Sequence, residues 1–242
     1  MESREPRRSG SEAPVVLPAV PWLVDGNQFE PYLESCLSHI KEQQCPEAKI
    51  LPPFITEAYK EKIVLDRKSQ QGFLNGKLNE IIDHFLGTDA THLWIVDADN
   101  EVPRNALCKL LVLDADLSSG ISPAHGPATM STVLKWFPPP SPEYPWSTPY
   151  YKPLPMSEVL GKYIDDTEFA FATGHFCFLA KRRVFDRLRF QWSPEQKLGN
   201  EILFWEYAQN LGLKCVIDGT VLCGHLPEWS LDTLEKALNW SN

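Results

Sequence analysis

The sequence lacks three features that assign many chains to a compartment or a ligand. No stretch reaches the roughly 18 consecutive apolar residues that a membrane-spanning helix needs, and the first residues lack the apolar core of a signal peptide. None of the six cysteines belongs to a C-x-x-C pair, which disfavours a disulfide framework or a zinc site. We therefore expect buried free thiols in a cytoplasmic protein that is soluble or peripherally associated with a membrane.

Basic residues are also in short supply. The chain has 23 lysines and arginines against 32 aspartates and glutamates, which gives a net charge of −9. Surfaces that bind nucleic acid are usually basic, so this balance argues against a general surface of that kind. It leaves room for a negatively charged ligand that is held by a metal ion and a few local cations.

The length of 242 residues suits one α/β domain with a substantial core. Residues 1–14 have the composition of a disordered tail, and we expect a single domain over residues 15–242. Strand patterns alternate with helical spacing in the N-terminal half, which predicts a mostly parallel sheet flanked by helices. The predicted strands lie at 15–24, 49–51, 62–65, 93–96 and 120–124, and the predicted helices at 29–40 and 74–85 and from Pro103 onward.

The pattern breaks over residues 125–155, which contain WFPPPSPEYPWSTPYYKPLP. This density of proline is incompatible with a regular helix or a central strand, so we predict a long loop insertion. Such a loop is either a stiff surface segment or part of a binding site for an acceptor or partner. Regular structure is expected to return with strands at 168–174, 176–180, 214–218 and 221–224, and with helices at 199–211 and near 231–238.

Two aspartates directly follow the most apolar predicted strand. Asp97 and Asp99 come after Leu93–Val96, and ligands of open parallel sheets bind at the carboxyl ends of the strands. Mg²⁺ and Mn²⁺ prefer oxygen ligands, commonly one or two carboxylates together with substrate phosphates. The aspartates could equally begin a turn. The same tripeptide recurs at Asp114–Asp116, where it follows a helix and no apolar strand precedes it.

Several segments together resemble GT-A-fold glycosyltransferases, especially the large family-two-like group. The first is HLWIVDADNEVPRNALCKLL, which is similar to the metal-binding segment of that family. The others, in chain order around it, are GKLNEII, ATGHFCFLAKRRVFDRLRF and GNEILFWEYAQNLGLKCVIDGTVLCGHL. The match extends over about residues 15–228 and implies a GT-A, Rossmann-like sheet.

The resemblance implies roles for the acidic residues and for one histidine. Asp97 and Asp99 would bind Mn²⁺ or Mg²⁺, which bridges the diphosphate of a nucleotide-sugar donor, and His225 would complete the metal shell. The family usually has Glu-Asp at the start of a helix, with the aspartate as general base of inverting members. This chain has Asn200-Glu201 there, which makes Glu201 the candidate base and leaves the stereochemistry open. From the residues alone, Glu201 is equally a first-turn carboxylate favoured by the helix dipole.

The resemblance also implies contacts with the two substrates. Arg67, Lys77 and Asn79 would contact the donor, although ordinary surface positions are an equal alternative. His175 follows Gly174 and is either a turn residue or a group close to the donor sugar or the acceptor. The aromatic candidates for acceptor contact are Trp136 and Trp146 in the proline-rich segment, whereas Trp205 has the helical spacing of a core residue.

The expected activity is therefore metal-dependent transfer of a sugar from a nucleotide-diphosphate donor. The acceptor is open among a glycan, a lipid carrier, a protein and a modified nucleic acid. A sugar-phosphate nucleotidyltransferase is the first alternative, but residues 15–27 contain one glycine and no basic residue where such enzymes usually carry a Gly-rich phosphate loop. The second alternative is a non-catalytic binding module on a degenerate transferase scaffold.

Overall fold

The computed structural model describes residues 12–22, 30–56, 67–124, 128–137, 150–167, 169–191 and 199–240. Its strands are β1 (Val15–Val20), β2 (Lys49–Ile50), β3 (Phe54–Ile55), β4 (His92–Val96), β5 (Asn100–Glu101), β6 (Leu117–Ile121), β7 (Met130–Phe137), β8 (Tyr150–Pro155), β9 (Tyr163–Asp165), β10 (Phe171–Ala172), β11 (Cys177–Lys181), β12 (Cys215–Leu222) and β13 (Gly224–His225). Its helices are α1 (Glu30–Lys41), α2 (Arg67–Leu86), α3 (Ala106–Val112), α4 (Met156–Val159), α5 (Asn200–Asn210) and α6 (Leu231–Leu238), with a 3₁₀ turn at Arg182–Val184.

An eight-stranded mixed sheet forms the centre of the molecule. Its order is β2-β1-β4-β11-β6-β12-β9, with β3 also paired to β1. Strands β1, β2, β3, β4, β6 and β12 run in one direction, and β11 and β9 run in the other. The prediction of a mostly parallel sheet flanked by helices is confirmed.

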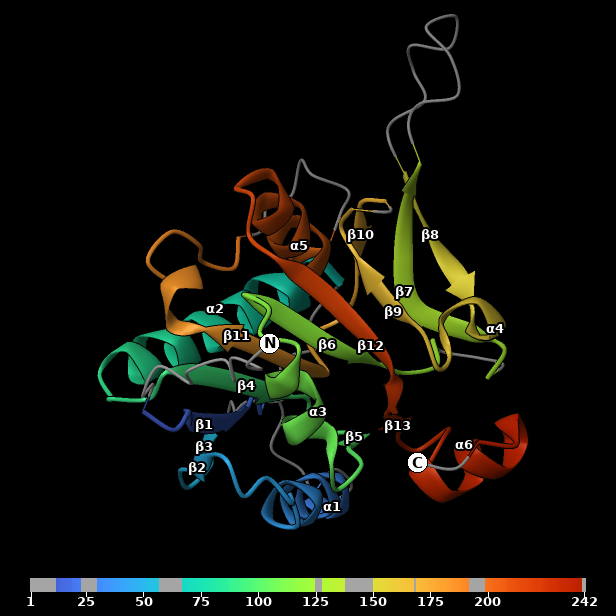
Figure 1. Cartoon of the computed structure of the whole chain (residues 1–242), viewed down its shortest axis with the longest axis horizontal. Helices are drawn as coiled ribbons and strands as arrows, with labels where there is room; N and C mark the ends of the chain where they lie inside the picture. The colour runs from blue at the N-terminus through green and yellow to red at the C-terminus, as the bar shows by residue number, and fades with distance from the viewer. Residues whose placement is uncertain are drawn as a thin grey trace, which may run out of the picture.

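The central strand β4 is apolar at every position from Leu93 to Val96 because both of its faces are covered. Leu93 and Ile95 belong to the core cluster that contains residues of α2 and α5. Trp94 and Val96 belong to the cluster that contains residues of α1 and α3. Side chains of a strand alternate between the faces of its sheet, so a strand with helices on both sides reads as one continuous apolar run. Figure 1 shows α2 and α5 on one side of the sheet and α1 and α3 on the other.

Most predicted elements are present, with shifted ends. Helix α3 begins at Ala106 rather than at Pro103, whose carbonyl accepts the Ala106 N–H in a preceding turn. Strand β6 begins at Leu117, earlier than predicted. Residues 215–218 and 221–222 lie in one strand, β12, and not in two. A shift of register after Ile217 accompanies Gly219, where a Cβ atom would lie 1.9 Å from the Val159 carbonyl oxygen.

The prediction of a loop throughout residues 125–155 is wrong for both of its flanks. Strands β7 and β8 pair antiparallel and form a second sheet, in the order β10-β7-β8. Pro153 and Pro155 are accommodated because β8 is the edge strand of this sheet, where a missing N–H donor breaks no ladder. Residues 125–127 and 138–149 lie outside the described part of the chain, as do most of the predicted tail and the predicted strand at 62–65.

Other predictions concern single residues. Trp205 is 1% exposed and packs in the core, as its helical spacing predicted.

All six cysteines are free thiols, and five of them are buried. Within the described residues, none of the helices combines the length and the apolarity that a membrane crossing requires.

Candidate functional site at the carboxyl end of β4

Asp97 and Asp99 lie in a tight turn where β4 leaves the sheet. The Asp97 N–H donates to the Phe176 carbonyl at 3.3 Å, which extends the pairing of β4 with β11 by one residue. The Asn100 N–H then donates back to the Asp97 carbonyl at 3.0 Å. The Asp97 side chain is 27% exposed and that of Asp99 is 46% exposed, so both carboxylates reach solvent.

A two-stranded ribbon brings the far end of the chain to this turn. Strand β13 pairs with β5, so that His225 lies opposite Asn100. The buried Asn100 side chain donates to the Gly224 carbonyl at 2.7 Å, although the two residues are 124 positions apart. A Cβ atom on Gly224 would lie 2.7 Å from the Leu231 nitrogen, so only glycine fits before His225. The ribbon lies beneath the main sheet, between α3 and α6, in Figure 1.

His225 faces Asp99 across this ribbon. Its Nε2 atom lies 3.7 Å from a carboxylate oxygen of Asp99, and the Leu226 N–H donates to the Asp99 carbonyl at 2.8 Å. The Asp99 carboxylate that faces Nε2 raises the pKa of His225, and burial opposes it. The charge of Asp99 and the Pro123 carbonyl add to the rise, and the pKa lies above its usual value. The structure thus places His225 beside Asp99, at the end of the sheet where the sequence placed the two aspartates.

His175 lies beside Asp97. Its Nδ1 atom lies 3.2 Å from both carboxylate oxygens of Asp97, and its side chain is 9% exposed. Burial alone lowers the pKa of His175, but the charge and hydrogen bond of Asp97, with the charges of Glu201 and Asp99, raise it above its usual value. The other ring nitrogen, Nε2, is buried and has no hydrogen-bond partner among the described residues. His175 is therefore a buried residue that contacts one carboxylate of the pair.

Glu201 lies in the first turn of α5, as predicted, and its charge acts on His175. Its carboxylate folds back over Gly199, where a Cβ atom would lie 2.4 Å from Oε1. Asn200 is buried, and its side chain binds Asn75 of α2 at 3.0 Å and accepts the Glu201 N–H at 2.9 Å. Asn200 thus anchors the start of the helix and leaves Glu201 half-buried beside the site.

The three donor-contact candidates on α2 are placed differently. Asn79 holds the backbone of Phe190 through two hydrogen bonds, at 3.0 Å and 3.1 Å, so its amide group has a structural partner. Lys77 is 7% exposed and its ammonium group lies 3.1 Å from Glu80. Lys77 and Asn79 are therefore not ordinary surface residues, which was the alternative to donor contact. Arg67 is the first residue of α2, but its side chain lies outside the described part of the structure.

The two tryptophans predicted to contact an acceptor cannot both be placed. Trp136 is half-buried on β7, opposite Tyr151 of β8, and its N–H donates to the Ala170 carbonyl at 2.9 Å. The β7–β8 ribbon rises away from the β5–β13 ribbon in Figure 1, so its far end is separated from Asp99 and His225. A cavity of about 450 Å³ lies against this ribbon and is lined in part by Lys135, Lys152 and Glu158. Trp146 lies outside the described residues.

Sequence reasoning missed the serine that follows β6. Ser122 is 1% exposed, and its buried hydroxyl has no hydrogen-bond partner in the part of the chain that the structure describes. Its carbonyl accepts from Thr132 at 3.1 Å, and the next residue, Pro123, contacts the His225 ring. No local motif marks Ser122, because its place after β6 and beside β7 follows from the tertiary fold.

The donors at this end of the sheet suit a hard divalent cation. Carboxylates are ligands that Mg²⁺ and Mn²⁺ prefer, and the Asp97 and Asp99 side chains both reach solvent. The ligand atoms of Asp97, Asp99 and His225 do not all lie within 4.8 Å of one another, since Asp97 turns to His175 and Asp99 to His225. The two aspartates therefore suit such an ion by chemistry, whereas the three side chains do not converge on one point in this conformation.

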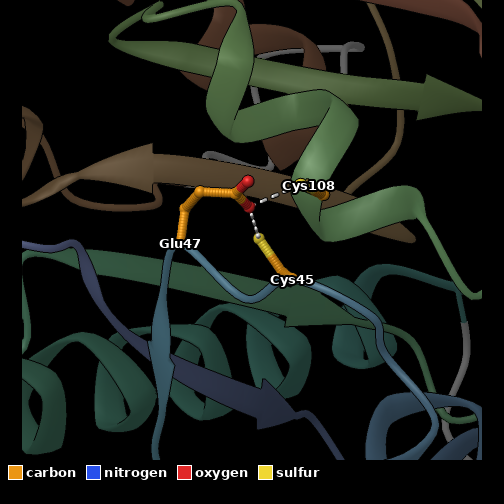
Figure 2. Close-up of side chains that lie close together, drawn as sticks. All are labelled: Cys45, Glu47 and Cys108. Carbon is orange, nitrogen blue, oxygen red and sulfur yellow. Dashed lines mark hydrogen bonds between the residues drawn. The ribbon is translucent and has the colours of Figure 1, made fainter.

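A second group of ligating side chains lies elsewhere, between the α1–β2 connection and α3. Glu47 binds the Cys108 thiol at 3.3 Å and the Cys45 thiol at 4.0 Å (Figure 2). Burial and the neighbouring Cys45 and Glu47 raise the pKa of Cys108 to about 12, and burial raises the pKa of Cys45. The sequence analysis expected buried free thiols and did not identify this cluster, because no sequence motif links Cys45 to Cys108.

Comparison with known proteins assigns no family to this chain. No family model matches the sequence, and no curated protein matches it. Among solved structures, A197 from STIV is similar in fold, with a TM-score of 0.52 over 88% of this chain and 85% of that chain. The two sequences are 11% identical, so the likeness concerns the fold alone.

Proposed function

We propose that the chain is a metal-dependent glycosyltransferase that uses a nucleotide-diphosphate sugar. The observation that carries the proposal is the pairing of β13 with β5, which brings His225 from near the end of the chain to Asp99 at the carboxyl end of β4. Open α/β sheets bind ligands at this end. The resemblance of the Asp97–Asp99 segment to GT-A-fold enzymes supplies the substrate class.

In this proposal Asp97, Asp99 and His225 hold Mn²⁺ or Mg²⁺. The bound cation would offset the negative charge that develops on the nucleoside diphosphate as it leaves. His175 orients Asp97 through Nδ1, as outer-shell partners of metal ligands do. Its buried Nε2 atom offers a further polar contact at the site.

Glu201 is the proposed general base. An acceptor hydroxyl is a weak nucleophile at neutral pH, so a carboxylate must take its proton as the hydroxyl attacks. Glu201 is half-buried, is positioned by the buried Asn200, and is close enough to His175 for its charge to act there. Direct displacement with such a base inverts the configuration of the transferred sugar.

Hydrolysis of a panel of nucleotide sugars, measured with and without Mn²⁺, tests the proposal. We expect release of nucleoside diphosphate that requires the cation and is abolished by a chelator. Release of pyrophosphate from a nucleoside triphosphate and a sugar phosphate would instead identify a nucleotidyltransferase. Thermal stabilisation by a nucleotide sugar without any turnover would identify a binding module. Turnover that is unchanged by the chelator would refute the metal role of Asp97 and Asp99.

A further inference from the structure

The cluster of Cys45, Glu47 and Cys108 is built from two separate segments of the chain. Cys45 and Glu47 lie between α1 and β2, and Cys108 lies in the first turns of α3. One ligand atom from each side chain lies within 4.8 Å of the other two. Figure 2 shows the carboxylate of Glu47 pointing between the two thiols.

The spacing matches that of ligands around one tetrahedral ion. With Zn–S bonds of about 2.3 Å and a Zn–O bond of about 2.0 Å, tetrahedral angles put two sulfurs roughly 3.8 Å apart and a sulfur and an oxygen roughly 3.5 Å apart. The Glu47 oxygen lies 3.3 Å from the Cys108 sulfur and 4.0 Å from the Cys45 sulfur. An ion could therefore enter with small side-chain movements and no change of backbone.

The surroundings hold the two segments in place before any ion binds. The Gln43 side chain donates to the Pro103 carbonyl at 2.9 Å and accepts the Leu107 N–H at 3.0 Å. The Gln44 N–H donates to the Arg104 carbonyl at 2.8 Å. These bonds join residues 43–44 to residues 103–107, directly beside the cluster. A preformed site of this kind loses little conformational entropy on binding.

The three side chains differ in exposure to solvent, so an ion could reach the cluster from the exposed side. Cys45 is 7% exposed, Cys108 is half-buried, and Glu47 is exposed. The cluster thus has a closed side made by a thiol and an open side made by the carboxylate. Three protein ligands with one open side leave a fourth position for water.

We propose that Cys45, Glu47 and Cys108 bind a soft divalent cation, Zn²⁺ in the first instance. Thiolate ligands select zinc over magnesium and manganese, whereas the carboxylates at Asp97 and Asp99 suit the harder ions. On binding, each thiol releases its proton to solvent and forms a sulfur–metal bond, and no oxidant or reductant takes part. The ion would fasten the α1–β2 connection to α3, which follows the Asp97–Asp99 turn and β5 directly in the chain.

Titration of the reduced, metal-free full chain with Co²⁺ tests this site by a signal that the oxygen-rich site cannot give. We expect one equivalent to produce near-ultraviolet absorption from charge transfer between thiolate and metal, and Zn²⁺ to displace it. Cys108→Ser and Cys45→Ser should weaken Co²⁺ binding at this signal by at least about 100-fold, since loss of an outer-shell partner alone costs 10–100-fold. Glu47→Gln should weaken it while leaving the fold intact, because Glu47 is exposed.

Matched controls separate the site from general effects of substitution. Cys215→Ala removes a buried thiol elsewhere, and Glu42→Gln removes an exposed carboxylate near the end of α1. Both should keep the signal, as should Asp99→Asn, so the outcome is independent of the proposed transferase activity. Absence of thiolate absorption in the reduced wild-type chain would overturn the proposal, as would a signal unchanged by Cys108→Ser and Cys45→Ser. Formation of a Cys45–Cys108 disulfide together with no Co²⁺ signal after reduction would identify a redox pair instead.

Discussion

The tripeptide Asp-Ala-Asp occurs twice in this chain, and the two copies lie at opposite ends of the strands of one sheet. Asp97–Asp99 follows β4 at its carboxyl end, and Asp114–Asp116 precedes β6 at its amino end. Strand β11 runs between the two copies. Its residue Cys177 pairs with Val96, just before the first copy, and its residue Ala180 pairs with Leu117, just after the second. Identical tripeptides therefore meet different surroundings.

The difference lies in what faces the carboxylates. Asp114 pairs with Lys181, and Asp116 pairs with Arg183 and accepts the Lys214 N–H at 3.0 Å. The cations hold the pKa of Asp114 below its usual value. Within the described residues, the ion pairs of the first copy are with histidines, His175 beside Asp97 and His225 beside Asp99. The second copy is therefore paired with lysine and arginine, whereas the first is paired with histidines and reaches solvent.

The largest expected effect comes from removing charge at the first copy. Asp97→Asn and Asp99→Asn should each lower Mn²⁺-dependent donor hydrolysis on the order of 10³-fold or more, since a catalytic cation contributes several kcal/mol. The Asp97→Asn change keeps an oxygen for the His175 ring, so the fold should be retained. Asp114→Asn is the matched control and should hydrolyse donor at the wild-type rate. An equal loss of donor hydrolysis in Asp114→Asn would show that the two Asp-Ala-Asp copies do not differ in function.

The next effect concerns the base. Glu201→Gln keeps size and polarity but removes basicity, so transfer to an acceptor should fall about 10²–10⁴-fold while donor affinity changes little. Glu206→Gln, on the same helix, is the control. The transfer rate is measured from product formation, and donor affinity is measured by titrating the protein with the donor. A product that retains the configuration of the donor sugar would rule out this role for Glu201.

The sequence was sufficient to predict the first copy because its signal is local. A continuous apolar run predicts a doubly covered strand, and acidic residues at its end predict a site at the edge of a parallel sheet. His225 was proposed as a site residue through the family resemblance, and the β5–β13 pairing places it beside Asp99. The position of Cys108 beside Glu47 depends on the packing of α3 against the α1–β2 connection, so it has no local signal.

The proline-rich segment shows what composition alone cannot predict. Its composition excludes a helix or a central strand, but edge strands tolerate proline, and β8 is such a strand. Composition cannot distinguish an edge strand from a loop, because the difference depends on whether a partner strand such as β7 is near. The same reasoning explains why Asp114–Asp116 could not be assigned from the sequence: Arg183 and Lys181 approach it only through β11.

The second copy should be sensitive to stability rather than to activity. Asp116 has a side chain that is 5% exposed, and Asp116→Ala would leave the Lys214 N–H without its acceptor. We expect a loss of about 1–3 kcal/mol in the free energy of unfolding. Asp114→Ala removes an ion pair whose aspartate is 85% exposed, and should change that free energy by less than about 1 kcal/mol. Urea denaturation of both variants measures the difference, and equal values would contradict the distinction.

The smallest expected effect is a pH dependence at Asp116. Burial alone raises the pKa of this carboxyl, but the hydrogen bonds from Arg183 and from the Lys214 N–H, with nearby positive charge, lower it below its usual value. An aspartate in the unfolded chain titrates near about 3.9, so the folded state holds the charged form more strongly. The stabilisation is therefore complete above that pH and is lost as pH falls through the lower, folded-state pKa. Asp116→Asn cannot titrate, so the difference in unfolding free energy between wild type and this variant should shrink as pH falls from about 6 to below about 4. Taking the difference cancels the titration of Asp114, which is present in both proteins. A difference that stays constant over this range would mean that the ionisation of Asp116 does not stabilise the fold, and the charge balance of the second copy would need another explanation.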